Sequence, residues 1–329
     1  MSDRKKLCIM FDFDLTMSTE CCQEPIFREN LEKIKEKYNT DEEIIKEPSD
    51  YWKMVDNNKG YDREISYLQC LLEDFKDGTM QRNGHNLTDE DLKYYGQFIK
   101  LAPGMIDFLK QIKTDLANVA DVSIYIVSVG ITNIILGSEV AEYVDGIIGT
   151  ELAATFNSNG HIDSIKKLNT SFNKIASLIE IAKGNSNINE KMISSAYKQE
   201  YDNALLIADG MSDIPSFEYA GKKGAIRIGV YDPTSMKAFN VAYKNLGTSV
   251  NAVVPRIYTP GSDTYNMILN YLRFMASPNR CNFPPQLIHM ERGGKIKHKE
   301  TSEYIKKHFM ECDSEYCSPA ILTYQIRPK

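Results

Sequence analysis

Hydrophobic and polar residues follow two different rhythms along this chain of 329 residues. Short apolar runs, such as the one at 7–11, are typical of buried strands, whereas apolar residues three or four positions apart are typical of helices. From about residue 101 the two kinds of segment alternate, which predicts an α/β fold with a parallel sheet covered by helices on both faces. The predicted strands are at 7–11, 122–127, 146–149, 204–208, 225–230 and 250–254, and the helices are at 106–116, 171–183, 189–199, from about 213, at 235–244 and at 263–275.

The segment from 17 to 100 has a different pattern. Its apolar spacing predicts helices near 26–38 and 65–75 and a third helix capped by Thr88, and no clear strand is expected between about 20 and 100. We therefore expect a mainly helical domain over 17–100, inserted into a core formed by 1–16 and 101–277.

Two further segments complete the predicted organisation. Residues 151–162 are typical of a β-hairpin, with Asn159 and Gly160 as its turn. Residues 278–329 lose the alternation of strands and helices and contain Pro, Gly and Lys clusters. We expect a C-terminal appendage there, with a loop followed by a polar helix.

Composition narrows the class of protein. The chain is 42% hydrophobic and 26% charged, as in ordinary globular proteins, and its net charge of −6 argues against a general nucleic-acid binder. No apolar stretch approaches the roughly 18 residues of a membrane span, so no membrane association is expected. The 7 cysteines are scattered, and the N-terminal apolar run is too short for a signal peptide, which predicts a cytoplasmic protein.

Asp12 and Asp14 come directly after the first predicted strand. Carboxylates at the end of a buried strand cost free energy unless they are paired or bind a metal. Side chains two positions apart share a face of a strand, so both could reach one site if the chain bends just after it. Asp-x-Asp also occurs as a solvated turn or helix cap, so the remaining motifs must decide between these interpretations.

A hydroxyl residue and a glycine follow the strand predicted at 122–127. In the segment Ser128-Val129-Gly130, the hydroxyl could donate to a phosphate, and N–H groups at the start of the next helix could point at the same anion. Taken alone, Ser-x-Gly is equally typical of an ordinary turn.

Acidic residues also follow the strand predicted at 204–208. Asp209 and Asp213 offer the oxygen ligands that hard cations prefer, and Gly210 permits a close approach of the backbone. Lys174 lies near the start of the helix at 171–183, where the helix dipole favours anions. That unfavourable placement favours a functional role over that of a surface lysine.

Together, these four motifs resemble those of the haloacid dehalogenase-like (HAD) hydrolase superfamily. Their order is Asp-x-Asp-x-Thr, Ser-x-Gly, Lys and Asp-Gly-x-x-Asp, and the resemblance covers about 5–16 and 101–255. It implies a doubly wound, Rossmann-like parallel sheet. The inserted segment 17–100 corresponds to the helical cap that such proteins carry between the first and second motifs.

The resemblance also implies a role for each motif. Asp12 would be the nucleophile that forms an aspartyl-phosphate, and Asp14 the general acid and later the general base. Asp12, Asp209 and the backbone carbonyl of Asp14 would hold Mg²⁺. The phosphate-binding residues would be Ser128, Val129, Gly130 and Lys174, supported by Thr16, Gly210 and Asp213, the last of which would orient Lys174 or bind a metal-bound water.

An acid at position 14 favours hydrolysis of phosphate esters, because an alkoxide leaving group needs a proton. We therefore expect a magnesium-dependent phosphatase for a small phosphorylated metabolite, with no nucleic-acid partner and no particular protein partner indicated. A phosphotransferase that uses the same intermediate and a non-catalytic phospho-ligand binding or scaffold protein are the alternatives. Possible contacts from the cap are Glu20, Tyr51, Trp52 and Tyr61, for which packing within the cap is the alternative interpretation.

Overall fold

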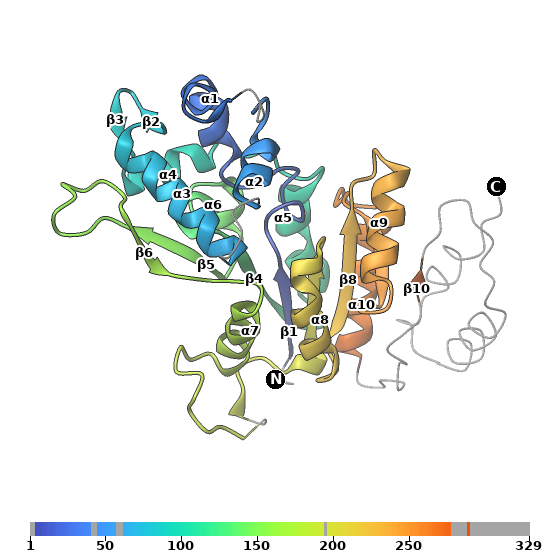
Figure 1. The fold of residues 1–329 in the computed structure, drawn as a ribbon. Coiled ribbons are helices and arrows are strands. Elements are labelled where there is room, and N and C mark those ends of the chain that lie inside the picture. The colour runs from blue at the N-terminus through green and yellow to red at the C-terminus, as the bar shows by residue number, and fades with distance from the viewer. Residues whose placement is uncertain (1–3, 41–44, 57–61, 194–195, 278–287, 290–329) are drawn as a thin grey trace.

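The computed structural model describes residues 4–40, 45–56, 62–193, 196–277 and 288–289. In this part of the chain the main sheet has the strand order β10-β9-β8-β7-β1-β4-β5-β6 (Figure 1). Neighbouring strands are parallel except β5 and β6, which are antiparallel. The strands are β1 (Lys5–Phe11), β4 (Ala120–Ile131), β5 (Gly146–Ala153), β6 (Ser164–Lys167), β7 (Ala204–Ala208), β8 (Ile226–Tyr231), β9 (Ala252–Pro255) and β10 (Ile288–His289).

Helices cover both faces of this sheet, as the alternating pattern predicted. Alternate side chains of β1 point to opposite faces: Leu7, Ile9 and Phe11 belong to one hydrophobic cluster, and Cys8 and Met10 to another. The first cluster includes residues of α5 (Met105–Leu116) and α10 (Asp263–Ala276), and the second includes residues of α7 (Asn173–Lys183), α8 (Ile214–Gly221) and α9 (Met236–Leu246). The predicted α/β fold class is confirmed.

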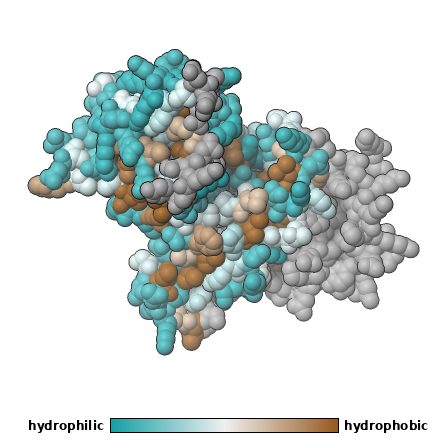
Figure 2. Space-filling view, viewed as in Figure 1, coloured by the Kyte–Doolittle hydropathy of each residue, from teal (hydrophilic) through white to brown (hydrophobic). Residues whose placement is uncertain are grey.

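Four helices and a small hairpin lie beyond the carboxyl end of β1 (Figure 1), and we call them the cap. They are α1 (Glu24–Tyr38), α2 (Pro48–Asp56), α3 (Arg63–Asp77), β2 (Gln81–Arg82), β3 (His85–Asn86) and α4 (Asp89–Gly96). Hydrophilic residues cover most of the cap on the face in Figure 2, and smaller hydrophobic areas lie where it meets the core. None of the helices in the described ranges is both long and apolar enough to cross a membrane.

Several predicted elements differ from the structure. The expectation of no strand between 20 and 100 is wrong, because β2 and β3 form a short hairpin around Asn83 and Gly84. Both turn residues have positive φ, 50° and 80°, the conformation that Asn-Gly favours in tight hairpins. The helix predicted at 189–199 is also wrong, since the described residues of this segment form turns and irregular backbone.

The predicted hairpin at 151–162 is only partly correct. Asn159 and Gly160 do have positive φ, but β5 begins at Gly146 and its partner β6 begins only at Ser164. The proposed loop and polar helix of 278–329 lie outside the described residues, apart from β10, which pairs with β9.

The cap meets the core through backbone contact between α4 and the four-residue helix α6 (Thr132–Ile135). A Cβ at Gly137 would lie 1.8 Å from the carbonyl oxygen of Lys93, and one at Gly96 would lie 2.1 Å from that of Ile134. Since no side chain fits between these backbones, the two glycines determine how closely α4 packs on α6.

Gly137→Ala should therefore force the two backbones apart. We expect a loss of about 3 kcal/mol in the free energy of unfolding, measured by urea denaturation, because overpacking here meets backbone rather than a flexible side chain. Glu90→Ala, on the exposed side of α4, is the matched control and should change stability by less than about 0.5 kcal/mol. Equal stability of the two variants would contradict this account.

Candidate active site

The site begins where β1 and β7 end side by side. The strands that follow β1 are added on one side of it, and β7, β8 and β9 are added on the other, so the strand order reverses between β1 and β7. Open α/β sheets bind ligands at such a reversal, beyond the carboxyl ends of the strands. The backbone N–H of Asp12 donates to the carbonyl of Ile207 at 2.9 Å, which places Asp12 beside the end of β7 and close to Asp209.

A sharp bend follows Asp12. The backbone N–H groups of Thr16, Met17 and Ser18 all donate to the carbonyl of Phe13, and Leu15 has a φ of 55°. Left-handed backbone at a leucine costs about 1–2 kcal/mol, so other contacts must hold it. The structure shows two such contacts from the segment after β9: Arg256 Nη1 donates to the carbonyl of Leu15 at 2.5 Å, and the Tyr258 hydroxyl donates to that of Thr16 at 3.1 Å.

The bend gives the first two acids different surroundings. Asp14 accepts a hydrogen bond at Oδ1 from the backbone N–H of Cys22 at 2.7 Å. A Cβ at Gly130 would lie 3.0 Å from Asp14 Oδ2 and 3.1 Å from Ser128 Oγ, so the second motif lies beside Asp14. Asp12 instead faces Lys174.

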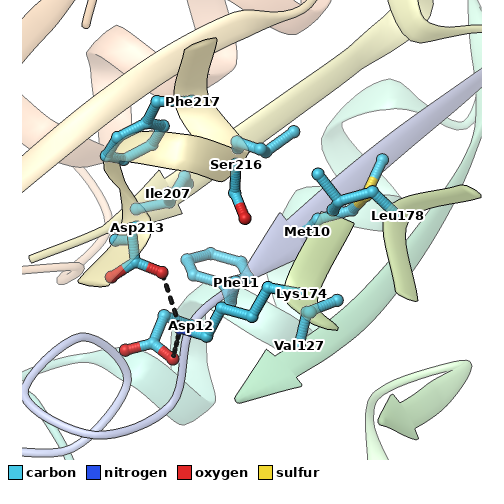
Figure 3. Close-up of a pocket in the computed structure, with 12 residues that line it drawn as sticks. Met10, Phe11, Asp12, Val127, Lys174, Leu178, Ile207, Asp213, Ser216 and Phe217 are labelled. Atoms are coloured by element: carbon cyan, nitrogen blue, oxygen red, sulfur yellow. Dashed lines mark hydrogen bonds and ion pairs between the residues drawn. The ribbon is translucent and has the colours of Figure 1, made fainter. Parts of the chain in front are cut away.

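Lys174 is the central cation of the site. Its side chain is buried, and Nζ donates to Asp12 Oδ1 at 2.7 Å and to Asp213 Oδ1 at 2.6 Å (Figure 3). It is the second residue of α7, and Asp213 lies immediately before α8, so two helices on the same face of the sheet hold this ion network. Asp213 therefore contacts the lysine directly, and the two roles that the resemblance implies for it stay predictions.

Carboxylate oxygens of Asp12, Asp209 and Asp213 lie within 4.8 Å of one another. Three carboxylates and the one ammonium of Lys174 carry more negative than positive charge, and an all-oxygen donor set suits a hard divalent cation such as Mg²⁺. The donor set therefore fits this ion. The expected metal-binding role of the Asp14 backbone carbonyl stays a prediction.

The titration of these acids follows from their burial. Burial raises the pKa of Asp14 to about 7, and the negative charge of Asp12 adds to this effect. Burial also raises the pKa of Asp12 to about 6, although Lys174 opposes the shift, and it raises that of Asp209 well above its usual range together with the charges of Asp12 and Asp213. Burial alone would lower the pKa of Lys174, but the two carboxylates outweigh it and raise that pKa. Asp14 can therefore carry a proton near neutral pH.

The segment Ser128-Val129-Gly130 has a different secondary structure from the predicted turn between a strand and a helix. The prediction that the strand ends at 127 is wrong, because β4 continues to Ile131, and the helix that follows it, α6, begins at Thr132, two residues after Gly130. The extension is held by side chains: Asn169 Nδ2 donates to the carbonyl of Ser128 at 2.6 Å, and Thr150 Oγ1 donates to that of Val129 at 2.9 Å.

The N–H of Gly130 donates to Ser128 Oγ at 3.0 Å, so the hydroxyl and this amide contact each other rather than converging from a helix start.

The predicted supporting residues Thr16 and Gly210 make weaker contacts with the site. Thr16 Oγ1 lies 3.5 Å from Asp209 Oδ1, the limit of a hydrogen bond, and a Cβ at Gly210 would find its nearest atom only at 3.4 Å. The neighbours of Gly210 therefore show no steric need for glycine.

Most of the residues that were predicted as possible contacts from the cap have partners within the protein. Glu20 pairs with Arg28 at 2.7 Å, Tyr51 donates to buried Asp74 at 2.6 Å, and Trp52 stacks on Tyr67 with ring centroids 3.7 Å apart. For Tyr51 the packing interpretation holds. Tyr61 lies outside the described residues.

Sequence reasoning missed the contacts that Cys22 and Arg256 make with the first motif. The backbone amide of Cys22 leaves no trace in a side-chain pattern. Arg256 could have been found, because it follows β9 just as Asp12 follows β1 and Asp209 follows β7.

A small cavity lies behind the lysine, between the sheet and helices α7 and α8 (Figure 3). Its lining is mostly apolar, and the polar residues that reach it are Asp12, Lys174, Asp213 and Ser216. Few polar groups therefore border Lys174 on this side, and surroundings of low polarity strengthen the electrostatic interactions within the ion network.

Among known proteins, no family model matches the chain. A curated relative, an uncharacterized protein of Borreliella burgdorferi, is 26% identical over 299 residues, which are 82% of this chain and 98% of the relative.

Solved structures similar to the chain include two of phosphoserine phosphatase, one with a phospho-aspartyl intermediate analogue and one with bound substrate. They are 18% and 17% identical, each with a TM-score of 0.48, and the matches cover 82% of this chain and all of theirs. Cytosolic 5′-nucleotidase IIIB bound to cytidine is 12% identical with a TM-score of 0.43, and the match covers 82% of this chain and 87% of that one. These similarities concern the fold alone.

Removing the central cation should test the ion network. Lys174→Met leaves Asp12 and Asp213 buried without their partner, so we expect a loss of about 3–5 kcal/mol in the free energy of unfolding at pH 8 in the presence of a chelator. The loss should be smaller at pH 5. Without the lysine the pKa of Asp12 rises further above its unfolded value, and a raised carboxyl pKa contributes stability that is lost as pH rises through it.

Chemical denaturation at both pH values measures this difference. Lys93→Met is the matched control, because Lys93 pairs with Asp89 on the surface, and it should cost less than about 1 kcal/mol at either pH. A loss that is the same at pH 5 and pH 8 would show that the charges of the buried acids are not the cause.

Proposed function

We propose that this chain is a phosphatase of the HAD-like superfamily that hydrolyses phosphate monoesters through an aspartyl-phosphate on Asp12. One observation carries the proposal: the buried ammonium of Lys174 is held between Asp12 and Asp213, beside Asp209, at the reversal point of the sheet. A carboxylate with a fixed cation and further oxygen ligands is what phosphoryl transfer needs, since its catalysis is mostly positioning and neutralisation of charge.

The two oxygens of Asp12 have separate tasks in this mechanism. Lys174 holds Oδ1, so we assign Oδ2 to the attack on phosphorus. A bond forms between Oδ2 and phosphorus while the ester P–O bond breaks, and the lysine offsets negative charge on the carboxylate and on the phosphoryl oxygens. Mg²⁺ held by Asp12 and Asp209 would supply further neutralisation of the phosphoryl oxygens.

Asp14 moves the proton. Its raised pKa keeps part of the population protonated near neutral pH, and the Cys22 amide fixes the carboxyl beside the second motif. Asp14 gives its proton to the departing alkoxide. In the second step it takes a proton from the water that attacks phosphorus, which releases inorganic phosphate and restores the Asp12 carboxylate.

Turnover tests the nucleophile. We expect the purified chain to release phosphate from some members of a panel of phosphate monoesters with Mg²⁺, to lose this activity with a chelator and to regain it when Mg²⁺ is restored. Asp12→Asn should lower kcat at least about 10³-fold, because it removes the attacking oxygen. Asp107→Asn, an exposed position on α5, is the control and should match the wild type.

Retained activity in Asp12→Asn would overturn the nucleophile assignment. Transfer of the phosphoryl group to an added alcohol in preference to water would identify a phosphotransferase. Tight binding of phosphoesters without any turnover would identify a phospho-ligand binding protein.

The leaving group tests Asp14. Asp14→Asn should lower kcat/KM for alkyl phosphates about 10²-fold or more, because an alkoxide needs the proton. The same substitution should have a much smaller effect on p-nitrophenyl phosphate, whose leaving group departs as a stable anion. Steady-state kinetics on both ester types measures the difference, and equal losses would rule out general-acid catalysis by Asp14.

A further inference from the structure

Two consecutive carbonyl groups near the end of β4 are held on the same side of the strand. Asn169 Nδ2 donates to the carbonyl of Ser128 at 2.6 Å, and Thr150 Oγ1 donates to that of Val129 at 2.9 Å. Thr150 Oγ1 also accepts from the backbone N–H of Asn169 at 3.2 Å, so the two donors are neighbours. In a regular strand, successive carbonyl groups point in opposite directions, so these side chains hold an irregular stretch of backbone.

Strand β5 shows the same direction for a third carbonyl. A Cβ at Gly149 of β5 would lie 2.8 Å from the carbonyl oxygen of Gly130 and 3.3 Å from that of Ser128. The pairing of β4 with β5 shifts its register between Val127 and Ile131, so the residues between them interrupt the ladder as in a β-bulge. The three carbonyl groups from Ser128 to Gly130 therefore all face the side of β5.

The amide groups of the same peptides must face the other side, because the N–H and the C=O of a trans peptide point in opposite directions. Two of the three amides show this directly. The N–H of Gly130 donates to Ser128 Oγ at 3.0 Å, and that of Ile131 donates to Cys22 Sγ at 3.3 Å. The N–H of Val129, whose peptide carries the carbonyl held by the asparagine, belongs to the same row of donors.

This row of amides lies beside the proposed general acid. A Cβ at Gly130 would lie 3.0 Å from Asp14 Oδ2, 2.9 Å from Cys22 Sγ and 3.1 Å from Ser128 Oγ. Ser128 is buried, whereas Val129 and Gly130 are partly exposed. Successive N–H groups on one side of a chain form a concavity that binds anions, and the serine hydroxyl can donate while it accepts from Gly130.

Asn169 also connects this row of amides to the helix that carries Lys174. Asn169 Oδ1 accepts from Ser177 Oγ at 3.2 Å, and the side chains of both residues are buried. Ser177 lies three residues after Lys174 in α7, and therefore on the same side of that helix. The asparagine thus uses its donor on β4 and its acceptor on α7, which fixes the amides relative to the ammonium group.

We propose that Asn169 is a positioning residue for the phosphoryl group. It holds the carbonyl of Ser128 toward β5, so that the amides of Val129 and Gly130 face the phosphoryl oxygens of the substrate. Asn169 itself does not touch the substrate and acts only through the backbone of β4. This assignment rests on the proposed function.

Kinetics with two ester types test this role. Asn169→Asp keeps the shape of the side chain and the acceptor for Ser177, but it removes the donor to the Ser128 carbonyl. At pH 8 we expect kcat/KM to fall about 10²-fold for alkyl phosphates and for p-nitrophenyl phosphate alike, because the displaced amides serve the phosphoryl group that both esters share. A loss confined to alkyl phosphates would show an effect on Asp14 and would overturn the proposal.

A buried asparagine of the cap is the matched control. Asn30 Nδ2 donates to the carbonyl of Ile26 at 3.0 Å, and its Oδ1 accepts from the N–H of Gln81 at 2.9 Å. Both Asn30→Asp and Asn169→Asp should lower Tm, but only the second should lower kcat/KM at a temperature below both transitions. Equal losses of activity in the two variants would make Asn169 a packing residue.

A milder variant keeps the test open if Asn169→Asp does not fold. Ser177→Ala leaves the donor to the Ser128 carbonyl in place and removes only the hydroxyl that holds Asn169 Oδ1. We expect kcat/KM to fall about 2- to 10-fold for both ester types, the range for losing one neutral hydrogen bond. Unchanged kcat/KM in a folded Ser177→Ala would contradict the connection between α7 and the amides.

Binding of inorganic phosphate distinguishes failure of this role from failure of the proposed function. In Asp12→Asn with Mg²⁺, calorimetry should show that adding Asn169→Asp weakens phosphate binding at least about 10-fold, as expected for hydrogen bonds to a charged group, and that adding Asn30→Asp does not. If the wild type turns over no ester but this dependence holds, the phosphatase proposal fails and the positioning role stands. Turnover with a kcat/KM and a Kd that do not depend on Asn169 would overturn the positioning role alone.

Discussion

The ion network of Lys174 with Asp12 and Asp213 is the interaction on which the rest of the site depends. The sheet brings the ends of β1 and β7 together, and this places three acidic side chains within 4.8 Å of one another. Buried charges of like sign would oppose that arrangement, and one cation from α7 offsets them. The second residue of a helix is an unfavourable place for a lysine, and the two carboxylates, at 2.7 and 2.6 Å, compensate for it.

The same network makes the first two acids unequal. Asp12 shares a proton donor with Asp213, whereas Asp14 is held by a backbone amide and has its pKa raised to about 7. Their separation depends on the bend at Leu15, which Arg256 and Tyr258 hold from the segment after β9. Two carboxylates only two residues apart thus have different partners, and burial raises the pKa of Asp14 to about 7 but that of Asp12 only to about 6.

The cap lies beyond the carboxyl end of β1, the strand that Asp12 follows. Several contacts attach it to the core, among them the backbone contact between α4 and α6 and the hydrogen bonds from Ser171 to Glu64.

The sequence by itself predicted most of the strands and helices of the core and the motifs that follow the strands, because apolar periodicity reflects which faces are buried and needs no distant partner. It placed Asp12 and Asp209 directly after predicted strands, and it singled out Lys174 from its unfavourable position. Only the tertiary structure decided that β4 continues through Ser128 and Gly130, that the amide of Cys22 holds Asp14, and that Arg256 holds the bend at Leu15. These features depend on contacts between residues far apart in the chain, such as Arg256 with Leu15, 241 positions away, and local spacing carries no information about them.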